Sequence, residues 1–489
     1  MEDDNNSWFT YKVYIWPYYI SPLRKFPGPP SENFLYGNLK TFFVEESGEA
    51  HLKWVKRYGK FVKYHGLLNE PAIIVTDAKL IHEIVSNHEF VKVKMIKGDL
   101  IRILGQSIAI VEGETHKRQR ETMKPAFAHN FIKDMVPKMV HVALKLKKFI
   151  DDEVNEDESK FNLSPYIFKT SLDIFGLIGY NYEFDSLSSP NELAEAFDSY
   201  LNAKMNFLYI SIGILSPYIP FLRKVPIQIN KRFNRACEVI ERESAKMVER
   251  KYNDKLKNET NLMATIIHVN ETLPIEKQMT KEELKSQVMT LTTAGHEAIN
   301  SSMSWALYLL AQHPHEQDLL REELVRAFPD KSNFNPTFDE INTLEYLNCI
   351  VKEVLRLYPI LTTLQRVNAK DQTFGEYFIP KGTTLDIPIF TLHRLPSIWG
   401  PTADIFDPKR WLNPSLIKDV TNYNYLPFSA GIRFCLGHKI GLIEIKILLS
   451  VLIRNFVFQT VKGFPLKKKA GFVSKPDSSL KLAVSKVEI

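Results

Sequence analysis

Apolar residues recur along the chain with two different periods, and the change of period divides the sequence. Short apolar or alternating runs typical of strands occupy residues 61–65, 72–76, 362–368 and 383–389. Between the two pairs of strands, apolar positions repeat every three or four residues, which predicts helices from about residue 78 to 355. The longest amphipathic runs cover residues 133–151, 227–252 and 281–312.

The rest of the chain has a different character. Residues 391–434 show neither period and are expected to be irregular, whereas residues 439–454 predict a last helix before a strand-like tail. No internal repeat and no glycine-rich phosphate loop is present in the sequence. A mainly helical chain with a minor β portion near both ends fits neither a doubly wound sheet nor a barrel. The expected fold class is therefore mainly α with a small β lobe (α+β).

Composition excludes some classes of function. The 489 residues are 44% hydrophobic, enough for a large buried core, and their net charge is only +6. Acidic and basic residues alternate along most of the chain, so we expect no nucleic-acid partner. The three cysteines, Cys237, Cys349 and Cys435, are too few and too irregularly spaced for a disulfide framework. They indicate a reducing compartment.

The first 25 residues form a separate segment. Residues 8–20 contain seven aromatic residues but are too short and too interrupted to span a bilayer. Tryptophan and tyrosine favour the membrane–water interface, so this segment is expected to be an interfacial anchor. The alternative is an aromatic segment packed on the protein's own surface. The prolines after Phe26 exclude a helix and separate the segment from the globular body.

The loop before the last predicted helix carries the strongest chemical signal. Cys435 lies where free backbone N–H groups and the helix dipole stabilise a thiolate, the form of cysteine that binds metals. Gly431 permits a tight turn, and Gly437 permits close approach of a flat ligand. Phe428 can shield the sulfur from water, and Arg433 offers a fixed cation for a carboxylate. The alternative is a buried structural cysteine.

This loop, residues 428–437, matches the haem-binding signature of the cytochrome P450 superfamily at each defining position. The resemblance extends from the proline-rich segment at 27–30 to the end of the chain, and eukaryotic microsomal members, fungal ones among them, are the most similar. It implies a single large P450 domain over residues 26–489. It also implies haem b (iron protoporphyrin IX) as cofactor with Cys435 as its thiolate ligand, a ligation that favours O–O cleavage.

Charged residues elsewhere resemble the family's structural group behind the cysteine loop. Glu353 and Arg356 are three apart and so share a helix face. Together with Arg410 they resemble the set that locks this loop in the family. Their expected role is structural rather than catalytic.

A second charged set resembles the family's haem-propionate ligands. His116 and Arg120 are four apart and share a helix face, while Arg366 lies on a predicted strand. For each, the alternative is a solvated charge. Lys117 and Arg118 are expected to point elsewhere, toward a redox partner.

The predicted helix at 281–312 resembles the family's oxygen-binding helix, which would lie over the haem. Small Ala294 and Gly295 would let it pass close to the cofactor, and Glu297 would supply an acid for proton delivery. A glycine inside a helix costs about 1 kcal/mol relative to alanine, so its presence suggests close approach. The chain departs from the family at Ala298, where most members carry threonine.

Alanine cannot donate a proton, so three interpretations of Ala298 remain open. Water, the substrate or Asn300 takes over the proton relay and oxygenation continues. Alternatively, the enzyme rearranges or dehydrates a peroxide, or couples radicals, without a reductase. In the third interpretation a small shift of the helix lets Thr293 serve instead.

The favoured interpretation is a haem-thiolate monooxygenase that oxidises an apolar small molecule with O₂ and electrons from an NADPH-dependent reductase. The alternative is a reductase-independent isomerase, dehydratase or peroxide-using oxidase; a haem-based sensor is a further rival, although no output domain is recognisable. The expected partners are the substrate, a reductase of the NADPH–cytochrome P450 type and a membrane surface, with the protein itself a monomer. The expected location is the cytosolic face of the endoplasmic reticulum.

Overall fold

The computed structural model describes most of the chain, and its close contacts divide the chain into two compact units. The first unit comprises Met1–Val93, Glu353–Cys435 and Lys467–Lys475, and the second comprises Lys94–Lys352, Leu436–Leu466 and Pro476–Ile489. Each unit has its own sheet and its own helices. The described residues are 7–154, 159–201, 207–216, 219–253, 261–330, 333–375, 377–462, 468, 474–476 and 480–487.

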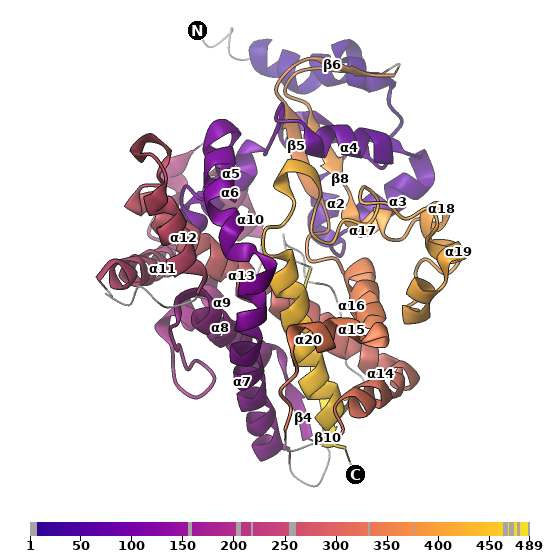
Figure 1. Ribbon diagram of the computed structural model, residues 1–489. Coiled ribbons are helices and arrows are strands. Elements are labelled where there is room, and N and C mark those ends of the chain that lie inside the picture. The colour runs from indigo at the N-terminus through magenta and orange to yellow at the C-terminus, as the bar shows by residue number, and fades with distance from the viewer. Residues whose placement is uncertain are drawn as a thin grey trace. The chain divides into compact units, whose positions relative to one another are not determined.

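The first unit is built on a five-stranded sheet with strand order β1-β2-β8-β5-β3, of which Figure 1 labels β8 and β5. β2 and β8 run parallel, whereas the other neighbours in the sheet are antiparallel. A separate hairpin is formed by β6 and β7. The strands are β1 (Phe61–His65), β2 (Pro71–Val75), β3 (Phe90–Val91), β5 (Leu364–Asn368), β6 (Gln372–Phe374), β7 (Tyr377–Ile379) and β8 (Thr384–Ile387). The four predicted strand segments therefore lie together in one sheet.

The apolar sequence of β2 explains its central place in this sheet. All five of its residues are buried, because both faces of the strand are covered. Side chains alternate between the faces of a strand. Ile73 and Val75 join a core that includes Ile81 and Val85 of helix α4, while Ile74 packs on the opposite side.

Short helices surround the sheet of the first unit, and the segment predicted to be irregular, 391–434, contains only helical turns of three to five residues. The helices are η1 (Tyr11–Ile20), η2 (Pro22–Lys25), α2 (Leu39–Val44), α3 (Glu49–Tyr58), η3 (Leu67–Asn69), α4 (Ala78–Ser86), α17 (Ile389–Leu392), α18 (Pro396–Trp399), η7 (Pro408–Leu412), α19 (Pro414–Ile417) and η8 (Gly431–Arg433).

The second unit is mainly helical. Its small antiparallel sheet has the order β4-β10-β9 and joins β4 (Ser159–Asn162) to β9 (Phe456–Thr460) and β10 (Lys481–Lys486). Its helices are α5 (Lys94–Leu104), α6 (Gly113–Met123), η4 (Lys124–Phe127), α7 (His129–Glu153), α8 (Ser164–Tyr180), α9 (Glu192–Leu201), α10 (Phe207–Leu215), η5 (Pro220–Lys224), α11 (Gln228–Asn253), α12 (Leu262–Thr272), η6 (Ile275–Lys277), α13 (Lys281–Gln312), α14 (Pro314–Ala327), α15 (Phe338–Thr343), α16 (Glu345–Leu357, whose last turn belongs to the first unit) and α20 (His438–Asn455).

Helix α13 is the main packing element of the second unit, in contact with α8, α11 and α20 (Figure 1). Its start is fixed by a capping box in which Thr280 accepts from the backbone N–H of Glu283 and the Glu283 carboxylate accepts from that of Thr280. The helix covers the predicted residues 281–312 without interruption. The expectation of a mainly α chain with a small β portion is confirmed.

The aromatic segment at the start of the chain forms a π-helix, η1, that is attached to the first unit on one side only. Val13 and Pro17 are buried, and the Val13 carbonyl accepts a hydrogen bond of 2.8 Å from the Asn69 amide. Tyr18 stacks on His65 of β1, with 5.7 Å between the ring centroids. Among the described residues, no helix has both the length and the apolar character needed to cross a bilayer.

His65 gives this attachment a dependence on pH. The imidazole is buried, and burial, helped by the nearby Lys63 charge, lowers the pKa of His65 to about 4 from its ordinary value of 6.5. The unfolded chain therefore binds a proton as the pH falls below 6.5, while the folded chain resists protonation until about pH 4. Stability present above pH 6.5 is lost as the pH falls through this window.

Replacing His65 by phenylalanine should keep the stack with Tyr18 and remove this titration. Each pKa unit corresponds to about 1.4 kcal/mol. Between pH 7 and pH 4, the free energy of unfolding should therefore fall by roughly 2–3 kcal/mol more in the wild type than in His65→Phe. Urea unfolding at a series of pH values measures this difference. The exposed His88 supplies the control variant His88→Gln. Parallel pH curves for wild type and His65→Phe would contradict the prediction.

Candidate active site

The loop that carries Cys435 is a closed turn held by its own backbone. The Cys435 N–H donates to the Phe428 carbonyl at 3.0 Å, so the two ends of the loop are tied together. Inside it, Ser429 N–H donates to the Leu426 carbonyl and Phe434 N–H to the Gly431 carbonyl, each at 3.1 Å. These backbone bonds hold the turn around the cysteine closed.

Glycine is required at position 431 for two reasons. Its φ of +65° lies in the left-handed region that side chains disfavour. A Cβ there would also lie only 2.1 Å from the backbone oxygen of Val85 in α4. The loop is therefore pressed directly against the backbone of α4, and any side chain at this position would displace it.

The three cysteines differ in exposure. Cys237 and Cys349 are buried, whereas Cys435 is exposed. Burial raises the pKa of Cys237 to about 12, so that thiol is inert at neutral pH. Free cysteine is usually among the most buried residues, and an exposed one in a rigid turn leaves room for a group to bind its sulfur. The alternative of a buried structural cysteine at position 435 is thus wrong.

The other loop residues predicted to hold a cofactor have mixed surroundings. Phe428 and Arg433 are half-buried. Gly437 caps the start of α20 with a negative φ, and a Cβ there would meet no protein atom nearer than 3.8 Å, an ordinary contact distance. Packing among the described residues therefore does not require glycine at 437, which is compatible with a ligand occupying that space.

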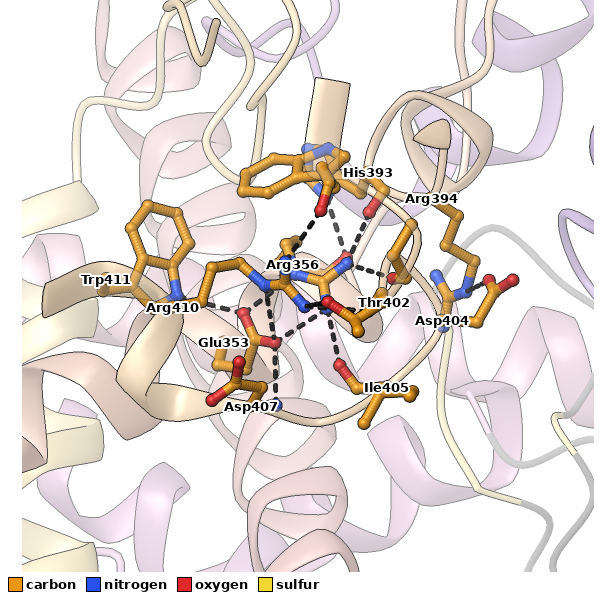
Figure 2. Close-up of polar contacts among 12 residues, drawn as sticks. Glu353, Arg356, His393, Arg394, Thr402, Asp404, Ile405, Asp407, Arg410 and Trp411 are labelled. Carbon is orange, nitrogen blue, oxygen red and sulfur yellow. Dashed lines mark hydrogen bonds and ion pairs between the residues drawn. The ribbon is translucent and has the colours of Figure 1, made fainter. Parts of the chain in front are cut away.

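Arg356 lies at the centre of a fully buried cluster in the first unit (Figure 2). It binds the Glu353 carboxylate through two parallel hydrogen bonds of 2.8 and 2.7 Å. Its other N–H groups donate to the backbone carbonyls of His393, Ala403 and Ile405 at 2.7, 2.5 and 3.0 Å. All five donors of the guanidinium are thus used, which satisfies a buried charge completely.

Glu353 is equally well satisfied. Besides Arg356, its carboxylate accepts from the backbone N–H of Asp407 and the indole N–H of Trp411, each at 3.0 Å. Arg410 approaches it at 3.5 Å and donates to two backbone carbonyls at 2.8 Å. The structure therefore brings Glu353, Arg356 and Arg410 together, and Figure 2 shows the last turn of α16 joined by them to residues 393–411.

Arg366 belongs to the same unit but to the sheet. It lies on β5 with only 6% of its surface exposed, and one guanidinium nitrogen donates to the backbone oxygen of Gln365 at 2.8 Å. A solvated charge would be exposed, so that interpretation of Arg366 is excluded.

In the second unit, α13 has one open stripe on an otherwise well-packed surface. Ala294 is exposed, while Leu291, Gly295 and Ala298, which share its face at helical spacing, are half-buried. Gly295 lies at the edge of this stripe, where a Cβ would be 2.5 Å from the ring of Phe175 in α8. Close packing of α8 thus gives Gly295 a structural role, and the open stripe fits contact with a flat group.

The polar residues of α13 bear on the choice of proton relay. Glu297 is 3% exposed. The Thr293 hydroxyl donates to the Met289 carbonyl of its own helix at 2.7 Å, and the Asn300 side chain accepts from Ser164 at 3.3 Å. Asn300 is two residues from Ala298, which places it about 200° away around the helix. The Thr293 hydroxyl is therefore bound within its own helix, and Asn300 lies on a different face from Ala298.

The predicted propionate ligands of α6 show a buried histidine beside a half-buried arginine. His116 is 2% exposed and Arg120 is half-buried. The expectation that Arg118 faces a redox partner is wrong. Its guanidinium donates to the Gln278 carbonyl at 2.9 Å and to the Glu283 carboxylate, so it ties α6 to the start of α13.

Two further residues of the first unit were not assigned a site role from the sequence. Trp411 donates to Glu353, and His393 is buried against Arg356. Their side chains gave no periodic signal, and only their position in the long irregular segment could have drawn attention to them.

The predicted site residues are divided between the two units. The first unit contains Glu353, Arg356, Arg366, Arg410, Phe428, Arg433 and Cys435. The second contains His116, Arg120, Ala294, Gly295, Glu297, Ala298 and Gly437.

Comparison with known proteins gives a consistent result over nearly the whole chain. The cytochrome P450 family model matches residues 27–483. Cytochrome P450 monooxygenase 205 of Postia placenta is 32% identical over 493 residues, covering 93% of this chain and 90% of the relative. Cytochrome P450 monooxygenase sphH of Aspergillus fumigatus is 30% identical over 499 residues, covering 98% and 91%.

Proposed function

The chain belongs to the cytochrome P450 family, and on that premise we propose that it oxidises an apolar small molecule with O₂ and with electrons from an NADPH-dependent reductase. It is a haem-dependent oxidoreductase of the monooxygenase type. The observation that carries the proposal is the exposed Cys435 in a backbone-closed turn. That turn holds the sulfur at a fixed position, from which it would bind a haem iron as a thiolate.

We take the cofactor to be haem b. Cys435 would hold its iron as the thiolate ligand, and Phe428, Arg433 and Gly437 would contact the group. The buried His116 and Arg366, together with Arg120, would bind the propionates. The N–H groups of an imidazole or a guanidinium can donate to a carboxylate, which supports the assignment.

When bound, a thiolate-ligated haem supplies oxygen activation, including the electron donation that favours O–O cleavage. The chain's own contributions are positioning and proton supply. Glu297 would be the acid through which protons are delivered, and the stripe formed by Ala294, Gly295 and Ala298 would leave space for O₂ and a water molecule. The apolar surface of this stripe favours an apolar substrate.

Ala298 does not require a different reaction class. Since Thr293 and Asn300 are engaged elsewhere, the relay we propose runs through water or through the substrate itself. The similar proteins are named monooxygenases, and Glu297 is present as a proton source, so the reductase-independent isomerase or peroxide-using alternative is not favoured.

The proposed function is tested by the spectrum of the reduced, CO-bound protein. A long-wavelength Soret band should form with dithionite and also with NADPH plus a microsomal reductase, since a thiolate ligand and electron transfer are both needed for the second result. Cys435→Ser should abolish the band, while Cys349→Ala, which alters a buried thiol, should keep it. Retention of the band in Cys435→Ser would overturn the assignment of the ligand. Formation of the band with dithionite but not with NADPH and reductase would overturn the proposal that a reductase supplies the electrons.

The water relay predicts the effect of adding the missing hydroxyl. Ala298→Thr should raise the ratio of product formed to NADPH consumed by about twofold or more, because a fixed donor improves proton delivery. Ala298→Val is the matched control, with nearly the same volume but no hydroxyl. Product, NADPH and released hydrogen peroxide are measured together. Equal ratios for the two variants, or complete loss of turnover by Ala298→Thr with haem bound, would contradict the relay.

We also propose that η1 binds a lipid surface, the cytosolic face of the endoplasmic reticulum. The helix is attached to the protein through Val13, Pro17 and the stack of Tyr18 on His65, while the side chains of Tyr11, Tyr14 and Tyr19 are exposed. Tryptophan and tyrosine with exposed edges favour the interfacial region of a membrane. The exposed set is Trp8, Phe9, Tyr11, Tyr14, Ile15, Tyr18, Tyr19 and Ile20.

Flotation with phosphatidylcholine vesicles tests this proposal. The triple variant Trp8→Ser, Tyr11→Ser, Tyr14→Ser should bind at least about tenfold more weakly, because it removes exposed aromatic side chains from η1 and from the turn before it. The control replaces Phe378, Ile405 and Leu412 by serine, three exposed apolar residues elsewhere in the first unit. Equal binding of the two triple variants would contradict the proposal.

A further inference from the structure

We propose that His393 is a positioning residue for the cysteine loop. Its neutral imidazole connects the Glu353–Arg356–Arg410 cluster to Leu426, which lies two residues before the loop. The inference rests on the proposed role of Cys435 as haem ligand. It concerns how that sulfur is held in place.

The two ring nitrogens of His393 bind two different backbone groups. Nδ1 lies 3.0 Å from the carbonyl oxygen of Arg356, and Nε2 lies 2.8 Å from the backbone nitrogen of Leu426. A carbonyl can only accept a hydrogen bond and a backbone N–H can only donate one. Nδ1 must therefore carry the proton and Nε2 must be unprotonated, so the partners select one neutral tautomer.

The surroundings keep the imidazole in that state. The side chain is fully buried, and burial lowers the pKa of His393 to about 3. The guanidinium groups of Arg356 and Arg394 act in the same direction, and the bond to the Arg356 carbonyl opposes them. A second proton would also place an N–H of the ring against the N–H of Leu426, so charging His393 would break the bond to the loop.

The ring has little freedom to rotate. It packs against Tyr425 at 5.2 Å and against Trp399 at 6.4 Å between centroids, and these two rings contact each other at 5.9 Å. The Trp399 indole is itself fixed by a bond of 3.0 Å to the Leu392 carbonyl. A rigid ring with a partner on each nitrogen sets the distance between its two partners.

Each end of this connection reaches a part of the site. At one end, Arg356 binds His393 twice, through the bond to Nδ1 and through its own guanidinium, which donates to the His393 carbonyl at 2.7 Å (Figure 2). At the other end, the Leu426 carbonyl accepts from Ser429 and the Phe428 carbonyl accepts from Cys435. Loss of His393 would leave the buried Leu426 N–H without this acceptor and release the entry of the loop.

Three variants separate positioning from general stability. His393→Phe keeps a ring but removes both bonds. His393→Gln retains one donor and one acceptor and is expected to restore much of the connection. Trp411→Phe is the control, because it removes the bond of 3.0 Å to Glu353 in the same cluster and leaves the bond between His393 and Leu426 in place.

Two readouts are required. Hydrogen exchange at the Leu426 amide, followed by mass spectrometry, should be at least about tenfold faster in His393→Phe than in wild type or Trp411→Phe, because only the first loses the acceptor. The CO-bound reduced protein should show loss of the long-wavelength band in His393→Phe and partial recovery in His393→Gln. Trp411→Phe should keep this band even if its thermal stability falls equally.

Unchanged exchange at Leu426 in His393→Phe, or equal loss of the band in His393→Phe and Trp411→Phe, would overturn the proposal. If His393→Phe does not fold, the comparison of His393→Gln with Trp411→Phe decides the same question. Absence of the band in the wild-type protein would instead overturn the role of Cys435 as haem ligand. In that case hydrogen exchange at Leu426 would still test whether His393 holds the loop.

Discussion

A buried carboxylate is the constraint on which the first unit depends. Glu353 has no exposed surface, so its charge must be matched inside the protein, and Arg356 and Arg410 supply the matching cations. Removing one partner of such a group typically costs about 3–5 kcal/mol, because an uncompensated charge stays behind. The guanidinium groups use their remaining donors on backbone carbonyls between residues 393 and 405. Irregular chain without regular secondary structure is thereby held in one conformation.

The cysteine loop takes its position from this cluster and from close backbone contact. His393 links Arg356 to Leu426, and Gly431 lets the turn lie against the backbone of α4. Within that turn the sulfur of Cys435 stays exposed, although its surroundings are rigid. In the second unit, the stripe at Ala294 is likewise open on a helix that is otherwise well packed. A rigid backbone that carries an exposed sulfur, and a helix face with small side chains, would each suit contact with a bound haem.

Much of this organisation could be predicted from the sequence, because strong periods and special residues leave clear patterns. Strands β1, β2, β5 and β8 of the main sheet, helix α13 with its bounds, and the grouping of Glu353, Arg356 and Arg410 are examples, whereas β3 lies in a stretch predicted to be helical. The roles of His393 and Arg118 could not be predicted, since each depends on partners more than 30 residues away in sequence. The Phe175 contact at Gly295 was hidden for the same reason: only tertiary packing shows which neighbour excludes a side chain.

The central claim is that the sulfur of Cys435 binds the haem iron. X-ray absorption at the iron edge measures this directly on the purified, haem-loaded protein. The account predicts a sulfur atom in the first coordination shell of the wild-type iron and only nitrogen or oxygen atoms in Cys435→Ser. An iron without a sulfur neighbour in the wild type, or with one in the variant, would contradict it.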